Sequence, residues 1–259
     1  MSPGLMSSGP MSTDRISRQR PFPLLPENGL RRRSLLSPTA LALVGLLLVS
    51  LVGGRTVAQT PAAGSDLDLG AVDFPTSGEE SAHRAFTTGL LALHSFWYPE
   101  ARAHFRRAQE IQPELAIAYW GEAMTYDHPL WGPLGQHDRK AGRTVLGRLD
   151  SVASARRLAA SERERAYLEA VRTLYEGRGD LAARRRAYLE EMEALAERYP
   201  DDEEATIFAA LARMSRPNFS LENADHVVPV AAPLEELFRE RRNHPGVLHY
   251  LIHAYDSDT

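Results

Sequence analysis

The amino-acid sequence predicts an all-α protein built from antiparallel helix pairs. From Glu79 onward, apolar residues recur at spacings of three and four positions, which is the period of an amphipathic helix. Residues of high helix propensity, namely Ala, Leu, Glu and Arg, dominate this part of the chain. The sequence lacks alternating β-branched runs, and its one β-branched cluster, 227–233, contains two prolines, which an interior strand does not tolerate.

The composition sets limits on the function. With 259 residues, of which 43% are apolar and 25% charged, the chain can build a core in one or two domains. The net charge of −4 argues against broad nucleic-acid binding, so we expect no nucleic-acid partner. The absence of cysteine excludes a disulfide framework, a thiolate zinc site, an iron–sulfur cluster and cysteine-attached haem.

The N-terminus predicts export. Residues 1–34 form a polar, basic leader that we expect to be disordered. Residues 35–58 hold an apolar core, 41–52, and end in the small residues of a signal-peptide cleavage site, so cleavage is expected after Ala58. The arginines at 31–33 also resemble a twin-arginine signal, which directs export of a folded protein. Export by the general pathway and export by the twin-arginine pathway therefore both stay open.

The alternative for this segment is an uncleaved membrane anchor. Its 18-residue stretch, 35–52, is interrupted at 37–39, whereas a spanning helix needs about 20 apolar residues. Both interpretations place the remaining chain outside the cytoplasm, in the periplasm or secreted. Residues 59–78 are expected to form a flexible linker into the helical domain, 79–259.

A repeat motif begins the helical domain. Gly89, Ala101, Phe105, Ala108 and Pro113 follow one another at spacings of 12, 4, 3 and 5 residues. These residue types at these spacings match a tetratricopeptide repeat, abbreviated TPR. The two small residues let paired helices approach closely, the aromatic ring fills the space between them, and the proline ends the second helix.

Three blocks carry a narrower resemblance: GLLALHSFWYPEARAHFRRA, AIAYWGEAMTYDHPLW and HPGVLHYLIHAYD. Together they resemble a family of exported bacterial TPR proteins of unassigned function, over about residues 80–259. The resemblance implies a right-handed α-solenoid whose concave groove binds a protein, a peptide or a metal ion. Family members continue with further helical repeats, which implies that this chain is an N-terminal portion.

The later elements follow in order. A helical pair spans 161–200, with Ser161 and Asp180 as expected N-caps, and another helix covers 202–214. We expect a loop over 216–232, a helix over 233–242, and a final helix that starts at Pro245. The long loop expected at 127–143 is of a length that often carries function.

The last helix holds the candidate site. At 100° per residue, His249, His253 and Asp256 fall within about 60° of one another on one helix face. An i,i+4 histidine pair with a nearby carboxylate suits zinc, copper or non-haem iron. The resemblance implies that His94 and His128 also face the groove, where either could supply a further ligand. His244, just before Pro245, is expected to be a cap or turn residue.

Two other interpretations of these histidines stay open: hydrogen-bonded structural residues, and general acid–base groups. For His94 and His128 a packing role is preferred, as it is for the aromatic residues at positions 96–98, 119, 120 and 131. HYLIH lacks the glutamate of HExxH, which argues against a zinc protease. Other carboxylates, and the arginines around Arg184 and Arg241, are expected on solvated faces. The predicted function is an exported binding scaffold; the alternative is a metal-dependent enzyme in the groove.

Overall fold

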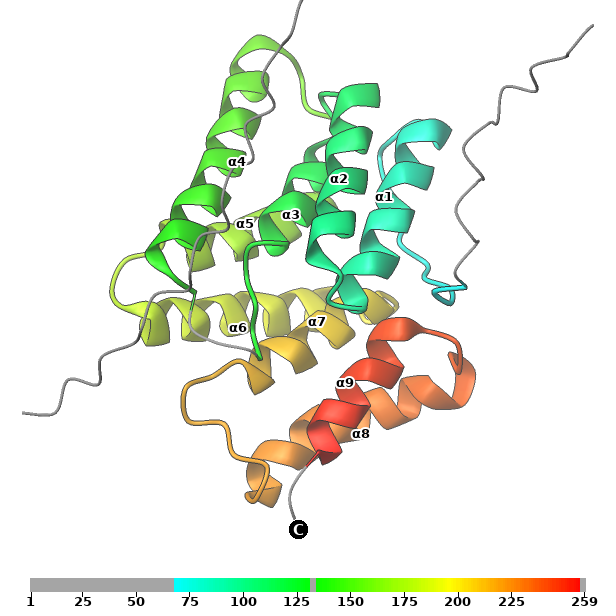
Figure 1. Ribbon diagram of the computed structural model, residues 1–259, viewed down its shortest axis with the longest axis vertical. Coiled ribbons are helices and arrows are strands. Elements are labelled where there is room, and N and C mark those ends of the chain that lie inside the picture. Colours follow the sequence, from blue (N-terminus) through cyan, green and yellow to red (C-terminus); the bar gives the residue numbers. More distant parts are fainter. Residues whose placement is uncertain (1–67, 131–133, 257–259) are drawn as a thin grey trace, which may run out of the picture. The chain divides into compact units, whose positions relative to one another are not determined.

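The computed structural model describes residues 68–130 and 134–256, and this part of the chain is helical (Figure 1). It contains no strand, only an isolated bridge between Leu115 and Ala159, so the predicted all-α class is confirmed. The helices of the described residues are α1 (Glu80–His94), α2 (Tyr98–Ile111), α3 (Ala116–Met124), α4 (Gln136–Ala155), α5 (Glu162–Glu176), α6 (Leu181–Arg198), α7 (Glu203–Met214), α8 (Ala224–Glu240) and α9 (Pro245–Tyr255).

The predicted leader and signal segment, 1–58, lies outside the described residues. Within the part that the structure covers, no helix combines the length and apolar character needed to cross a bilayer.

The first helix pair packs as its motif predicts. Phe105 of α2 is fully buried between α1 and α3. A Cβ added to Gly89 would lie 2.9 Å from the Phe105 ring, and one added to Gly121 would lie even closer. Both glycines therefore make room for the same aromatic ring, and the predicted burial of Phe105 is confirmed.

An aromatic cluster joins the helices of the core. Trp120 of α3 contacts Phe74, Phe86, Tyr167 and Phe208, with ring centroids 5.1–6.4 Å apart. These residues come from α1, α5, α7 and the segment before α1. Trp120 thus joins Phe74 and Phe208, which lie 134 positions apart in the sequence.

Part of the expected flexible linker belongs to this core. Phe74 is only 2% exposed, and Arg163 lies over its ring, 4.2 Å from the centroid. The backbone N–H of Ser77 donates to Glu164 Oε1 at 2.8 Å. The linker interpretation is therefore wrong for residues 68–78. The buried ring of Phe74 holds this otherwise polar segment against the core.

The helices do not contact only their neighbours in sequence. Consecutive helices pack together from α1 to α9, as in a repeat array, but α9 also contacts α7 and α1. Figure 1 shows α6 and α7 running across the lower ends of α1 and α2, with α8 and α9 beneath them. In a strictly stacked array each repeat would contact only the repeats next to it. The contact between the last helix, α9, and the first, α1, is therefore a feature that the repeat pattern did not predict.

Two boundaries differ from the sequence prediction. α4 begins at Gln136, so the connection after α3 is shorter than the expected loop 127–143. α8 begins at Ala224, so its first part, with Pro229, occupies residues where a loop was expected, and Pro233, expected to begin the helix, lies inside it. Each interior proline costs about 3 kcal/mol, and the cost is offset by the burial of apolar residues on the inner face of α8, namely Val230, Ala231 and Leu234.

The predicted helix starts are confirmed. Ser161 caps α5 in a capping box with Glu164, and Asp180 caps α6 by accepting from the backbone N–H of Ala183. Pro245 is the first residue of α9. It follows His244, whose side chain accepts hydrogen bonds from the first backbone N–H groups of the helix.

Candidate functional site

Two histidines on α9 direct the same ring nitrogen toward each other. His249 and His253 lie one turn apart, and their Nε2 atoms are 3.1 Å from each other. His249 Nδ1 donates to the backbone carbonyl of His94 at 2.7 Å. A carbonyl can only accept, so the Nδ1 of His249 carries the proton and its Nε2 presents a lone pair. The hydrogen-bonded state is therefore His253 Nε2–H donating to His249 Nε2.

Phe96, in the turn between α1 and α2, supports both imidazoles. Its ring centroid lies 4.4 Å from that of His249 and 5.9 Å from that of His253. Phe96 has a positive φ of 54°, the only such value among described residues other than glycine. It occupies the position after a helix end that usually holds glycine. A bulky residue in this strained conformation is typical of a functional position.

A cavity of about 920 Å³ opens beside the pair. His253 and Asp256 line it from α9 and its C-terminal end. Its other walls come from α6, from α7, and from residues 129–130 and 215–222. The side chains that line these walls are partly apolar, as at Leu181, Met214 and Phe219, and partly polar, as at Arg216 and Glu222. Burial lowers the pKa of His253, and the neighbouring His249 lowers it further, which favours a neutral ring.

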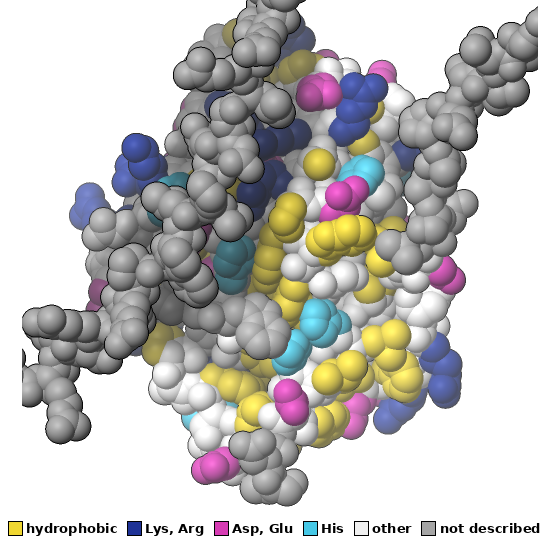
Figure 2. Space-filling model, in the orientation of Figure 1, with side chains coloured by type: hydrophobic (Ala, Val, Ile, Leu, Met, Phe, Trp, Pro, Cys, Tyr) yellow, Lys and Arg dark blue, Asp and Glu magenta, His cyan; other side chains and the backbone are white. Residues whose placement is uncertain are grey.

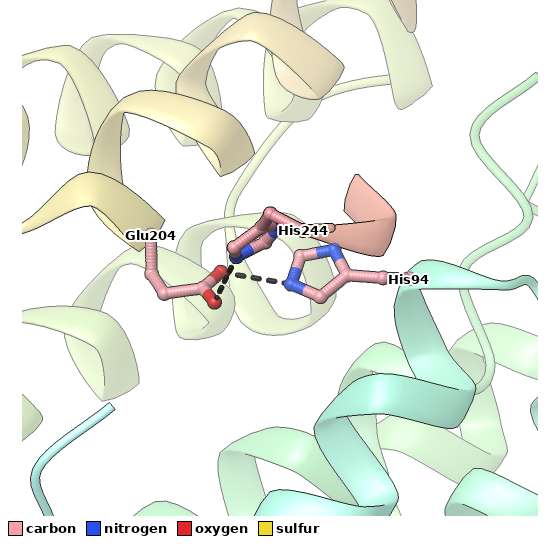
Figure 3. A group of neighbouring side chains, drawn as sticks. All are labelled: His94, Glu204 and His244. Carbon is pink, nitrogen blue, oxygen red and sulfur yellow. Dashed lines mark hydrogen bonds and ion pairs between the residues drawn. The ribbon is translucent and has the colours of Figure 1, made fainter. Parts of the chain in front are cut away.

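A second cluster, formed by His94, Glu204 and His244, is buried (Figure 3). His94 Nε2 lies 2.8 Å from Glu204 Oε2, and His244 Nε2 lies 2.9 Å from Glu204 Oε1. His94 Nδ1 contacts the hydroxyl of Tyr250 at 3.1 Å. Burial alone would raise the pKa of Glu204, but the two histidines outweigh it and bring the value to about 2. Burial lowers the pKa of His94 despite the opposing effect of Glu204.

The donor atoms of this cluster are close enough to hold a metal ion, but the hydrogen bonds of His244 oppose ligation. Its Nδ1 accepts from the backbone N–H groups of Gly246 and Val247, at 3.1 and 3.3 Å. The proton of the neutral ring is therefore on Nε2, the atom that points at Glu204. Both imidazoles donate to one carboxylate, which satisfies the cluster without a metal ion. We interpret it as a polar core that holds α1, α7 and α9 together.

The predicted ligands are only partly brought together. His249 and His253 meet, and Asp256 lies exposed just beyond them at the end of α9. His94 is entirely buried, so the expectation that it faces a groove is wrong, although its backbone carbonyl orients His249. His128 packs against Tyr98, with ring centroids 4.3 Å apart and the rings tilted by 36°, which agrees with a packing role.

Sequence reasoning missed several buried charges. Glu122, Glu164 and Glu204 are fully buried, although carboxylates were expected at the surface. Arg184 and Arg185 are also buried, and Arg185 donates to both oxygens of buried Asp127. For Glu204 a signal existed, because it shares a helix face with the apolar residues at 207, 208 and 211. Arg241, in contrast, is exposed as expected.

Comparison with known proteins gives no relative for this chain: no protein-family model, no curated protein and no solved structure matches it.

Proposed function

We propose that this chain is an exported, TPR-like helical scaffold that binds a transition-metal ion through His249 and His253 at the edge of the cavity. The packing of Phe105 against Gly89 supports TPR-like helix pairs, because it places the motif residues where such a repeat needs them. The residue pattern of positions 31–58 supports export. The convergence of the two imidazoles on one point is the observation that carries the metal site.

The separation of the imidazoles suits a shared metal ion. Zinc–nitrogen bonds of 2.0–2.1 Å at a tetrahedral angle place two ligand atoms about 3.3 Å apart. The two Nε2 atoms are already at 3.1 Å, so a small opening of the pair would admit the ion. The ion would take the place of the proton between the two nitrogens, and that proton would move to Nδ1 of His253, so that each neutral ring offers the lone pair of its Nε2.

The surroundings of His249 support ligation as well. Metal-bound histidines commonly donate their second ring N–H to a carbonyl or carboxylate, which fixes the tautomer and the ring orientation. His249 already makes this bond to the carbonyl of His94, and Phe96 packs against its ring. The arrangement is therefore organised for a ligand role before any ion binds.

The remaining coordination positions would point toward the cavity. Asp256, the residue that ends α9, follows His253 by three positions and lines the same cavity, so its carboxylate is a candidate for a third ligand. Water or a donor group of a partner peptide would complete the shell. Two or three protein ligands with open positions are typical of a site that binds a further ligand through the metal.

Titration of the purified protein with Zn²⁺ and with Co²⁺, followed by calorimetry and by the visible Co²⁺ spectrum, tests this proposal. His249→Ala and His253→Ala should each weaken binding at least about tenfold, since even an outer-shell change costs that much. His104→Ala is the matched control, because His104 lies on α2 beside Glu100, away from the cavity. Equal affinity in the α9 variants and the control would reject the site.

A further inference from the structure

A buried carboxylate on α3 organises two arginines from different helices. Glu122 accepts hydrogen bonds from Arg106 Nε of α2 at 2.8 Å, from Gln109 Nε2 at 2.8 Å, and from Arg148 of α4. Glu122 is fully buried, whereas the two arginine side chains remain 49% and 44% exposed. The carboxylate therefore fixes both guanidinium groups at the surface without enclosing them.

Both guanidinium groups keep donors for another molecule. Arg106 uses Nε for Glu122 and Nη2 for the hydroxyl of Tyr126, and Arg148 uses Nη2 for Glu122 and Gln109. Among the residues that the structure describes, Nη1 of each arginine has no hydrogen-bond partner. One negative charge meets two positive charges, so the pair retains a net positive charge.

Further basic residues extend this surface along α4. One broad face of α4 is exposed and carries the basic residues Lys140, Arg143 and Arg148, together with the uncharged Thr144 and Gly147. Figure 2 shows basic side chains gathered between the positions that α2 and α4 occupy in Figure 1. None of these five residues is acidic, although the whole chain has a net charge of −4.

Gly147 is a second, independent sign of a binding surface. Glycine inside a helix costs about 0.5–1 kcal/mol relative to alanine, so it needs a reason. Gly142 of the same helix has one, since an added Cβ would collide with the ring of Tyr175. At Gly147 an added Cβ would meet no atom within 4 Å. Packing does not explain this glycine, but the close approach of a bound chain would.

We propose that the surface formed by Arg106, Arg148 and the exposed face of α4 binds an acidic peptide segment in an extended conformation. From Lys140 to Arg148 the basic face runs about 12 Å along the helix, the length of roughly four extended residues. Several carboxylates of one segment can therefore meet successive basic side chains. This site is separate from the histidine pair and does not depend on metal binding.

Fluorescence anisotropy with a labelled octaglutamate peptide at low ionic strength tests the proposal on the purified protein. The double variant Arg106→Gln/Arg148→Gln should bind at least about tenfold more weakly, which corresponds to the loss of one charge-assisted hydrogen bond. The control Arg107→Gln/Arg156→Gln removes the same charge from two exposed ion pairs elsewhere, and it should bind within about twofold of the unchanged protein.

A second variant covers the case in which the double variant unfolds. Gly147→Leu leaves the Glu122 network intact and improves the helix, so it should keep the thermal stability while weakening octaglutamate binding about tenfold. The proposal is overturned if octaglutamate does not bind the unchanged protein, if the control loses as much affinity, or if Gly147→Leu binds normally. Tighter binding of a single-stranded oligonucleotide through the same residues would also overturn it.

Discussion

His249 presents a lone pair toward His253 because a backbone carbonyl holds the proton of its other nitrogen. The residue that shapes this turn is Phe96, at a positive φ where glycine is usual. Phe96→Gly should relieve the backbone strain, and Phe96→Ala should keep it, so the glycine variant should be more stable by about 1 kcal/mol. Thermal denaturation of the two variants checks this difference.

The same pair of variants separates strain from function. Both lose the ring that packs against His249 and His253, so we expect both to bind Zn²⁺ about tenfold more weakly than the unchanged protein. A Phe96→Gly protein with unchanged zinc affinity would contradict the supporting role of the ring.

Glu204 makes the stability depend on pH. Burial disfavours the ionised form of Glu204, but His94 and His244 favour it more strongly, so the pKa falls from the ordinary 4.5 to about 2 in the folded protein. A lowered carboxyl pKa stabilises the fold fully above the unfolded value, and this stability is lost as the pH falls from about 4.5 toward 2. The groups facing the carboxylate are the two histidines, with Tyr250 beyond His94.

Chemical denaturation between pH 6 and pH 3 measures this effect. Glu204→Gln should show a smaller loss of stability over that range than the unchanged protein. Its amide can still pair with both rings if His94 changes tautomer, whereas Glu204→Ala leaves two buried N–H groups without acceptors, at about 1–3 kcal/mol each. An identical acid dependence in Glu204→Gln would show that this carboxylate does not control it.

At the scale of elements, short-range signals predicted helix starts and pair packing. As predicted, Ser161 and Asp180 are N-caps and Pro245 is the first residue of its helix. These positions could be predicted because capping depends only on residues within one turn. The α8 prolines misled the sequence prediction, because the burial that offsets their cost depends on helices distant in the sequence. The role of 68–78 was missed for the same reason, since Phe74 finds its partners only in the folded core.

Phe74 and Phe105 give a matched test of these elements. Both rings are buried, one in an apparent linker and one in a predicted repeat. Each change to alanine should cost about 3–5 kcal/mol in unfolding free energy, as for other buried aromatic residues. Urea denaturation measures both, and a loss below about 1 kcal/mol for Phe74→Ala would restore the linker interpretation.

At the scale of the whole molecule, helical periodicity predicted the all-α class, but it carried no information on the contact between α1 and α9. That contact places the carbonyl of His94 beside His249, 155 residues away, so the orientation of the candidate site could not be predicted from sequence. The i,i+4 spacing of His249 and His253 did predict their shared face, because it depends on helix geometry alone.

Export also concerns the whole molecule. If 35–58 is a cleaved signal, the protein isolated from its host should begin at Gln59. N-terminal sequencing checks this prediction, and retention of the apolar segment 41–52 would favour the anchor instead. Replacing Arg32 and Arg33 by lysine should block export only on the twin-arginine route.

The central claim is that a transition-metal ion binds between His249 and His253. Crystals of the protein grown with Zn²⁺ and measured at the zinc absorption edge would locate the ion directly. We predict an anomalous peak within 2.0–2.1 Å of both Nε2 atoms, with open coordination toward the cavity. A peak inside the cluster of His94, Glu204 and His244, or no peak on α9, would contradict the account.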